Sequence, residues 1–300
     1  MHKVPHTKAH LAHIFAIFAL MKYEKINLED YILTGEGGTA LSYDSKDGKR
    51  LLKLFNKGYD IGSVEREFGV NMTVFQMGLP TPRPFRLVTD GERFGTEYEL
   101  IRNKRSFTRI ISQEPEQLEP LSRLFARLAK EIHTKQADTA KLPDERAFYK
   151  AGIMAIESLT DAQRDKVLTR LYNLPSATTC LHGDLHIGNI ITDGNRNLWI
   201  DVGEFGYGAP QWDLSMLYYA TNFIGPERAD NIFHLTPDTL KKHWLLFAKE
   251  YFGTENEDEI HAIERSLMPY ALIKVIFSWG KITGGKTPMT DGLAAMIDTL

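Results

Sequence analysis

Short apolar stretches separated by turn residues occupy residues 31–101 and predict a region rich in β-strands. Asp47-Gly48 lies between two of these stretches and is a typical hairpin turn signal. Residues 61–77 differ, because their apolar positions recur at helical spacing and Gly78 follows as a helix stop. The predicted strands cover residues 31–33, 40–43, 50–55, 85–88 and 94–101.

From about residue 114 onwards the apolar positions follow a helical period, most clearly over residues 118–134. A β-rich island interrupts this pattern at 178–201, where the run ITDGNRNLWID predicts a strand, a turn and a second strand. The other predicted helices cover residues 144–158, 161–173, 210–224, 237–252 and 257–282.

These patterns predict an α+β fold with two lobes. A small, β-rich N-lobe is expected at residues 22–101, followed by a polar linker at 102–113. A larger, mainly helical C-lobe is expected at 114–300, and it holds the β-rich island.

Residues 1–21 pair a His- and Lys-rich stretch with an apolar run, and we expect them to form an N-terminal extension. The apolar run, 11–20, has ten residues, whereas a membrane-spanning helix needs about 20. A signal peptide is one interpretation, but Ala16 and Ala19 do not have the A-x-A spacing of a cleavage site. We favour a short helix or a start upstream of the natural initiator, Met21. No later segment has 18 consecutive apolar residues, so a soluble protein without a membrane partner is expected.

The charges of the 300-residue chain nearly cancel, with 36 Lys and Arg against 39 Asp and Glu. A protein whose main task is to bind nucleic acid usually carries an excess of basic residues, so no nucleic-acid partner is expected. Cys180 is the only cysteine, which excludes an internal disulfide and a multi-cysteine zinc site. A single cysteine fits a reducing compartment, and we expect a cytoplasmic protein. The sequence leaves the oligomeric state open.

The β-rich island carries the residues with the clearest chemistry. A His-x-Asp-x4-Asn motif contains Asp184 and Asn189, and a predicted strand, turn and strand lead from it to an Asp-x-Gly motif that begins at Asp201. This order and spacing are typical of phosphoryl transfer in protein-kinase-like enzymes. In-line transfer needs a carboxylate that orients the attacking hydroxyl and takes its proton, and Asp184 fits this role. It also needs oxygen ligands for Mg²⁺, and adjacent strands would direct Asn189 and Asp201 to one point.

The strings LHGDLHIGN and WIDVGEFGYGAPQWDLS resemble the aminoglycoside phosphotransferase and choline kinase-like family. The resemblance covers residues 30–260 and implies a bilobal protein-kinase-like fold. It also implies ATP and Mg²⁺ as cofactors and a small molecule with a hydroxyl group as the acceptor. Three positions depart from the usual family pattern, namely Val202, Glu204 and Ala209, and none of them is a predicted metal ligand.

The resemblance also identifies nucleotide-binding candidates in the N-lobe. Lys53 matches the third-strand lysine that holds the ATP phosphates, and Glu65 and Glu67 compete to be its partner. We choose Glu67, because Arg66-Glu67 followed by a helix and Gly-x-Pro fits the family pattern. The backbone N–H groups of three glycines would approach the phosphates, namely Gly35, Gly37 and Gly38. Two further residues, Glu99 and Ile101, are expected to meet the edge of the adenine ring.

Four residues of the C-lobe are expected to support the reaction. His182 is expected to bond the backbone and shape the catalytic loop. Asp213 resembles the downstream aspartate of the family, which braces that loop by hydrogen bonds. His186 and Glu204 could contact the phosphates or the substrate, although His186 could equally be a packing residue.

Three other functions compete with a small-molecule kinase. A protein kinase needs a long segment between Asp-x-Gly and Ala-Pro-Glu, whereas only eight residues separate Asp201 from Pro210. A non-catalytic nucleotide-binding module would usually lack Asp184 or Asp201, and both are present. A facial-triad iron site starting at His182 would leave Asn189 without a role. Aromatic residues could form a cage for a quaternary ammonium but are more typical of a core: Trp212, Tyr218, Tyr219, Trp244, Tyr270 and Trp279.

Overall fold

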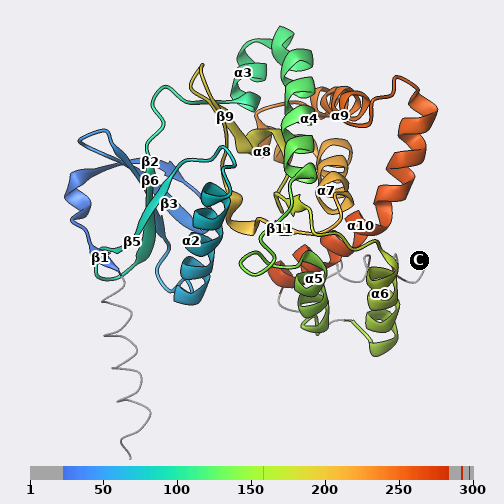
Figure 1. Cartoon of the computed structure of the whole chain (residues 1–300), viewed down its shortest axis with the longest axis horizontal. Coiled ribbons are helices and arrows are strands. Elements are labelled where there is room, and N and C mark those ends of the chain that lie inside the picture. Colours follow the sequence, from blue (N-terminus) through green and yellow to red (C-terminus); the bar gives the residue numbers. More distant parts are fainter. Residues whose placement is uncertain (1–22, 158, 284–291, 293–296, 298–300) are drawn as a thin grey trace, which may run out of the picture. The chain divides into compact units, whose positions relative to one another are not determined.

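The computed structural model describes residues 23–157, 159–283, 292 and 297 (Figure 1). The expected N-terminal extension, 1–21, therefore lies outside the described residues. The chain divides between Asn103 and Lys104 into two compact units, which we call unit 1 and unit 2. The fold is mixed, with the large sheet in unit 1 and nearly all the long helices in unit 2.

Unit 1 is built on a six-stranded sheet with the order β1-β5-β6-β4-β3-β2. The described pairs are antiparallel except for β1 and β5, which are parallel. Gly48 has φ 68° in the predicted turn between β3 and β4, a conformation that glycine adopts without strain. The elements are β1 (Glu24–Lys25), η1 (Leu28–Asp30), β2 (Tyr31–Glu36), β3 (Ala40–Ser45), β4 (Arg50–Phe55), α2 (Ile61–Gln76), β5 (Pro84–Thr89) and β6 (Phe94–Glu99).

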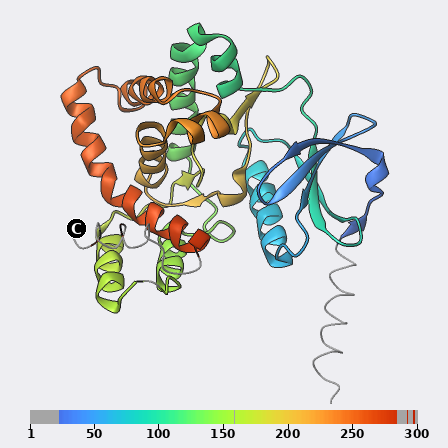
Figure 2. The same cartoon turned by 180° about the vertical axis from the view of Figure 1, so that it is seen from behind.

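Helix α2 lies against one face of this sheet in both views (Figure 1 and Figure 2). The helix begins after Asp60, whose carboxylate accepts a hydrogen bond from the backbone N–H of Ser63 at 2.7 Å. Val64 of the helix packs with Phe55 and Leu87 of the sheet. A separate apolar cluster joins Leu52 to other residues of the sheet, so apolar contacts hold both faces of the strands that carry the nucleotide-binding candidates.

Unit 2 is mainly helical and contains two small sheets, with the orders β10-β9-β7 and β11-β8. The predicted strand, turn and strand of the island are present as β9 and β10, and Gly194 has φ 94° in the turn between them. The helices are α3 (Phe107–Gln113), η2 (Pro115–Gln117), α4 (Leu118–Thr134), α5 (Glu145–Met154), α6 (Asp161–Asn173), η3 (Ile187–Asn189), η4 (Val202–Glu204), α7 (Gln211–Asn222), α8 (Pro226–Phe233), α9 (Pro237–Phe252) and α10 (Glu257–Thr283). The strands are β7 (Arg105–Ser106), β8 (Cys180–Leu181), β9 (Ile190–Thr192), β10 (Asn197–Trp199) and β11 (Gly206–Tyr207).

The expected linker at 102–113 is wrong over most of its length, because residues 105–113 form β7 and α3. Strand β7 pairs with β9 and so joins the β-rich island. The Ser106 side chain then caps α3 by accepting a hydrogen bond from the backbone N–H of Arg109 at 3.2 Å. Phe107 and Ile111 are buried, so this polar-looking segment is fixed by two apolar anchors and a helix cap.

Helices α4 and α9 pack closely, and the buried face of α4 matches its predicted amphipathic pattern. Phe125 lies at the centre of this contact and is fully buried. Its ring centroid lies 5.4 Å from that of Phe247, 5.6 Å from that of His243 and 5.7 Å from that of Trp199. The Trp199 ring in turn lies 5.0 Å from the ring of His182, so a chain of aromatic contacts connects α4 to the segment that begins at His182.

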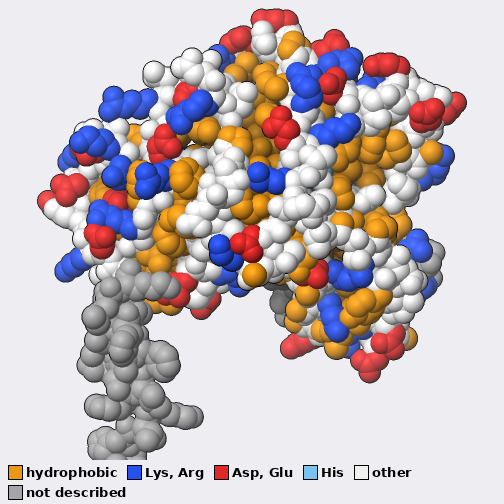
Figure 3. Space-filling view, viewed as in Figure 1, with side chains coloured by type: hydrophobic (Ala, Val, Ile, Leu, Met, Phe, Trp, Pro, Cys, Tyr) orange, Lys and Arg blue, Asp and Glu red, His pale blue; other side chains and the backbone are white. Residues whose placement is uncertain are grey.

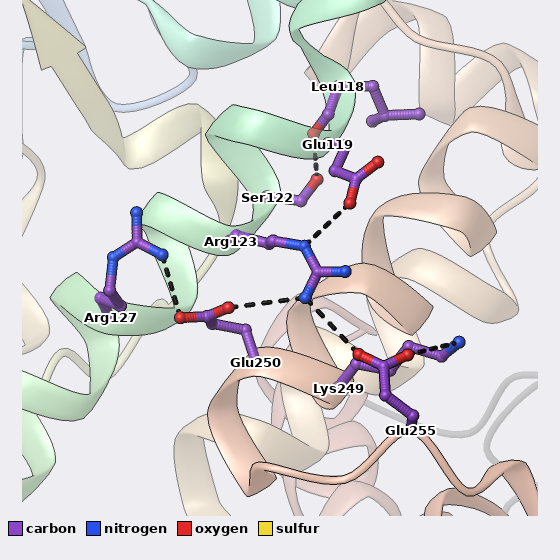
Figure 4. Close-up of polar contacts among 8 residues, drawn as sticks. All are labelled: Leu118, Glu119, Ser122, Arg123, Arg127, Lys249, Glu250 and Glu255. Atoms are coloured by element: carbon purple, nitrogen blue, oxygen red, sulfur yellow. Dashed lines mark hydrogen bonds and ion pairs between the residues drawn. The ribbon is translucent and has the colours of Figure 1, made fainter.

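A polar network lies at the edge of the same helix pair (Figure 4). Arg123 of α4 donates to Glu119 one turn earlier at 2.9 Å and to Glu250 of α9 at 3.5 Å. Arg127 donates to the other oxygen of Glu250, also at 2.9 Å. These side chains are partly exposed, so the ion pairs orient the two helices but contribute little to the free energy of unfolding.

Charged side chains of both signs are interspersed over the face drawn in Figure 3, as the nearly balanced composition leads one to expect. Within the part of the chain that the structure describes, no helix combines the length and the hydrophobicity needed to cross a membrane.

We predict that Phe125→Ala lowers the free energy of unfolding by about 3–5 kcal/mol, because it leaves a cavity between α4 and α9. Arg127→Ala on the exposed side of α4 is the control and should cost no more than about 1 kcal/mol. Both values can be measured by urea unfolding followed by circular dichroism. Equal losses for the two variants would contradict the assignment of Phe125 to the core.

Candidate active site

Residues 182–189 connect β8 to β9 and carry Asp184. Because Asp184 is the predicted catalytic residue, we call this segment the catalytic loop. Gly183 has φ 85°, and a Cβ added there would collide with the backbone oxygen of Glu204. The position therefore requires glycine for both the left-handed conformation and the close approach of two backbones. The turn at Gly183 sets the direction in which the side chain of the next residue, Asp184, leaves the backbone.

Asp213, in the first turn of α7, binds the backbone of this loop. Its carboxylate accepts hydrogen bonds from the backbone N–H of His182 at 2.6 Å and from that of Gly183 at 3.0 Å. His133 Nε2 donates to the same carboxylate at 3.1 Å. Burial alone would raise the pKa of Asp213, but the hydrogen bond and charge of His133 hold it below the usual value. Asp213 is therefore an ionised anchor, and the predicted hydrogen bonds to the loop are present.

Lys274, on α10, binds the carbonyl group of the same residue, Gly183. Its Nζ donates to the backbone oxygen of Gly183 at 2.9 Å and to that of Trp212 at 3.4 Å. Lys274 is itself buried, so its charge lies in a region of low polarity near Asp213. The Gly183 N–H and C=O groups are thus both fixed by charged side chains from distant helices.

Glu145, at the start of α5, lies in this buried region with only 5% of its surface exposed. No described residue offers a hydrogen-bond partner to its Oε2 atom. Burial raises the pKa of Glu145 to about 8, and the nearby charge of Lys274 only partly opposes this effect. The Glu145 carboxyl group is therefore protonated over much of the range below neutral pH.

Asp184 itself is half exposed, with 48% of its side chain accessible. Burial of the rest raises its pKa, but the hydrogen bond from His186 and the nearby charge of Lys274 help to outweigh this and hold the pKa well below the usual range. His186 Nδ1 accepts from the backbone N–H of Gly188 at 3.1 Å, so the ring proton is on Nε2, which lies 3.5 Å from Asp184 Oδ2. His186 thus lies beside the candidate catalytic carboxylate.

Asn189 and Asp201 are brought to the same place by the pairing of β9 with β10. The backbone N–H of Ile200 donates to the oxygen of Asn189 at 3.0 Å, directly before Asp201. Asn189 Nδ2 donates to the backbone oxygen of Asp184 at 2.9 Å and to its Oδ2 at 3.3 Å. Because its amide nitrogen is used in this way, Asn189 would offer its amide oxygen to a metal ion.

His182 ties this strand to the catalytic loop. Its Nε2 donates to the backbone oxygen of Ile200 at 3.2 Å, so the predicted bond from the histidine to the backbone is present. Burial lowers the pKa of His182, and the side chain is therefore neutral. Asp201 follows at φ 54° and directly precedes η4, the last residue of which, Glu204, is exposed.

The described residues include no group of three or more His, Cys, Asp or Glu side chains that could hold a metal ion. Asn189 and Asp201 supply one amide and one carboxylate instead. This donor set fits Mg²⁺, which proteins usually bind through one or two carboxylates and which takes its other ligands from water and substrate phosphates.

The predicted ion pair of unit 1 is present, because Lys53 Nζ on β4 lies 2.7 Å from Glu67 Oε1 on α2. The alternative partner, Glu65, instead accepts a hydrogen bond from the Tyr23 hydroxyl at 3.5 Å. Both members of the Lys53 pair are partly exposed, so the ammonium group remains close to solvent.

The three predicted glycines lie at the turn between β2 and β3, but they differ in their surroundings. Gly35 belongs to β2 and pairs with Ser42 at a register shift. The Gly37 N–H donates to the backbone oxygen of Ala40 at 2.9 Å, which closes the turn. A Cβ added at Gly38 would meet no atom within 4 Å, so the backbone there is open to a ligand.

The two residues predicted for the adenine edge lie at the end of β6 and just beyond it. The Glu99 N–H donates to the backbone oxygen of Arg83 at 2.8 Å, so this group is already used inside the sheet. Ile101 follows and is buried, with 4% of its surface exposed. Ile101 is therefore the stronger of the two candidates for a backbone contact with a base.

A family model described as the phosphotransferase enzyme family matches residues 36–240, which is more than half of the chain. The chain belongs to this family. No curated protein sequence matches the chain significantly. The matched part includes the Lys53–Glu67 pair of unit 1 and the catalytic loop and Asp213 of unit 2, so the match covers candidate residues in each unit.

Several solved structures share the fold of this phosphotransferase family member. The apo form of a thermostable mutant of aminoglycoside phosphotransferase APH(4)-Ia has a TM-score of 0.58 at 14% identity, over 90% of this chain and 93% of that one. ADP-bound aminoglycoside phosphotransferase APH(2'')-Ib has a TM-score of 0.57 at 18% identity, over 95% and 96% of the two chains. A choline/ethanolamine kinase family protein from Mesorhizobium loti has a TM-score of 0.50 at 15% identity, over 90% and 87%. The expected kinase-like α+β fold is therefore confirmed.

Motif spacing in this phosphotransferase family does not identify three of the buried polar residues around the loop, namely His133, Glu145 and Lys274. Each lies far in sequence from Asp184 and comes from a different helix. One signal was present for Lys274, because it is the only charged residue in the apolar run ALIKVIF. A lysine at a position whose neighbours are all buried needs acceptors inside the protein.

We predict that Glu145→Gln changes how stability depends on pH. The folded state raises the pKa of Glu145 from 4.5 to about 8, so the folded protein binds the proton more tightly than the unfolded chain does. This contribution is complete below about pH 4.5 and is lost as the pH rises towards about 8. The unfolding free energy of the native protein should therefore fall relative to that of Glu145→Gln by more than about 1 kcal/mol across this window.

Urea unfolding at several pH values would measure this difference between native protein and Glu145→Gln. Glu227→Gln, at an exposed position of α8, is the matched control for the removal of a carboxylate. A pH-independent difference for Glu145→Gln would contradict the assignment of a buried, protonated carboxyl group.

Proposed function

We propose that this phosphotransferase family member transfers the γ-phosphate of ATP to a hydroxyl group of a small molecule. The observation that carries the proposal is the arrangement around Asp184, where Asn189 is hydrogen-bonded to the aspartate and the Asp201 strand is tied to the same loop. A carboxylate beside two oxygen donors for a metal ion is the arrangement that in-line phosphoryl transfer requires.

Asp184 is the group that would orient the acceptor. The carboxylate is half exposed and ionised, so it can accept a hydrogen bond from a hydroxyl group. The hydroxyl oxygen attacks phosphorus, the bond from phosphorus to ADP breaks, and the hydroxyl proton passes to Asp184. The hydrogen bonds that hold Gly183 keep the Asp184 side chain in place while this occurs.

Asn189 and Asp201 would hold Mg²⁺ through their side-chain oxygens. When bound, Mg²⁺ would neutralise charge on the phosphate groups of the nucleotide. Asn189 also bonds to Asp184, so the residue links the metal position to the candidate catalytic residue.

Residues of unit 1 would bind the nucleotide. Lys53, held by Glu67, would contact the phosphates as a compact cation, and the open backbone at Gly38 would approach them. Ile101 would meet the adenine edge. A structural neighbour with this fold was solved with ADP, which supports an adenine nucleotide as the ligand.

A small molecule is favoured over a protein as the acceptor, because a protein kinase uses a long activation segment to dock its substrate. In this chain η4 and β11 fill the interval between Asp201 and the start of α7.

A cytoplasmic location is also proposed, because the single cysteine, Cys180, is buried and unpaired by any disulfide.

We predict that Asp184→Asn lowers phosphate transfer at least about a hundredfold, because the amide can no longer accept the hydroxyl proton. The affinity for ATP should change no more than about threefold, since the nucleotide candidates lie elsewhere. ADP release would be measured with Mg-ATP and a panel of aminoglycosides, amino alcohols, vitamins and sugars, and ATP binding by calorimetry.

Asp165→Asn, on the exposed side of α6, is the matched control and should leave transfer unchanged. Transfer within tenfold of the native rate in Asp184→Asn would show that Asp184 does not have the assigned role.

A further inference from the structure

A cavity of about 290 Å³ opens directly beside Asp184 within unit 2. Its walls come from the catalytic loop, α7, α8 and the segment that joins these two helices. The volume is at the lower end of the range for sites that bind small molecules. An acceptor placed here would have its hydroxyl group next to the candidate catalytic carboxylate.

Most of the cavity wall is apolar or aromatic. Tyr219 and Phe223, one turn apart on α7 and at its C-terminal end, stack with ring centroids 5.6 Å apart and an angle of 26° between the rings. Phe223 is 54% exposed and Ile232 on α8 is 45% exposed, which is high for large apolar side chains. Met216 also lines the cavity. A ligand with an apolar face would remove these side chains from water.

Few charged side chains line the cavity, and their signs disfavour the binding of a cationic ligand. Among the described residues that line it, Asp184 is the one carboxylate and Arg228 of α8 supplies a full positive charge. Glu227 and Asp230 belong to the same helix but do not line the cavity. A polycationic ligand needs several carboxylates, whereas this cavity offers one that is already assigned to the reacting hydroxyl.

We propose that the phosphate acceptor is a small alcohol that carries an apolar or aromatic body and no positive charge. Its hydroxyl lies at Asp184, its apolar face covers Tyr219 and Phe223, and an acidic group, where present, pairs with Arg228. This inference rests on the proposed phosphate transfer and specifies the acceptor class of the same site. It distinguishes this chain from structural neighbours whose names specify aminoglycosides.

A matched series of aromatic alcohols tests the proposal that the acceptor carries no positive charge. The compounds are para-(hydroxymethyl)benzoate, the corresponding benzamide and the corresponding benzylamine, with kanamycin as a polycation. Binding to the full chain is measured by calorimetry with ADP and Mg²⁺ present, and transfer by ADP release from Mg-ATP. We expect the benzoate to bind at least tenfold more tightly than the benzylamine, with the benzamide between them. Tighter binding of benzylamine or kanamycin, or no binding by any member, overturns the proposal.

Two test variants and one control variant show which residues select the ligand. Arg228→Glu should weaken benzoate binding at least tenfold and reverse the order of benzoate and benzylamine, because it replaces the cation with an anion. Lys241→Glu makes the same charge change at an exposed position of α9 and should leave the order intact. Phe223→Ala should weaken all three aromatic alcohols about fivefold to tenfold. An unchanged order in Arg228→Glu contradicts the assignment of Arg228.

The measurements of binding and of ADP release distinguish an error in the acceptor class from an error in the proposed function. Binding in the expected order without any ADP release would retain the ligand class and overturn phosphate transfer. ADP release that depends on Asp184 but favours the cationic compounds would retain phosphate transfer and overturn the acceptor class.

Discussion

The carboxylate of Asp213 holds two successive backbone N–H groups, those of His182 and Gly183, and the position of Asp184 depends on this contact. Lys274 binds the carbonyl of Gly183, so both backbone polar groups of the residue before Asp184 are fixed. The partners lie 30 and 91 residues away in sequence from Gly183. The catalytic loop therefore takes its shape from helices α7 and α10 and not from its own short sequence.

This arrangement requires charged groups to lie in the interior, where an unpaired charge is costly. Asp213 is ionised and has three hydrogen-bond donors, one of them from His133 of α4. Lys274 has two backbone acceptors, and Glu145 avoids a charge because burial raises its pKa. The stability of unit 2 and the position of Asp184 thus depend on the same buried groups.

The sequence allowed the strands of unit 1 and the long helices to be predicted, because their spacing is local. Local spacing also led to the roles proposed for Asp184, Asn189 and Asp201. The Lys53–Glu67 contact was also predicted, although two glutamates competed. The segment 105–113 was misjudged, since its polar residues conceal the apolar anchors Phe107 and Ile111. Helix α8 has only eight residues, too few for a clear helical period, and it was missed. Contacts such as Lys274 to Gly183 join residues that no motif spacing relates.

The residues proposed for phosphate transfer and those proposed to line the acceptor site come from different parts of unit 2. The catalytic loop and the first turn of α7 carry the family motifs, whereas Phe223, Arg228 and Ile232 lie at the end of α7 and on α8. Arg228 and Ile232 are four residues apart, so both can face one cavity from a single short helix. Substitutions on α8 can change the charge and shape of the cavity without touching Asp213 or its hydrogen bonds. Membership of the phosphotransferase family therefore constrains the chemistry at Asp184 much more than it constrains the molecule that receives the phosphate.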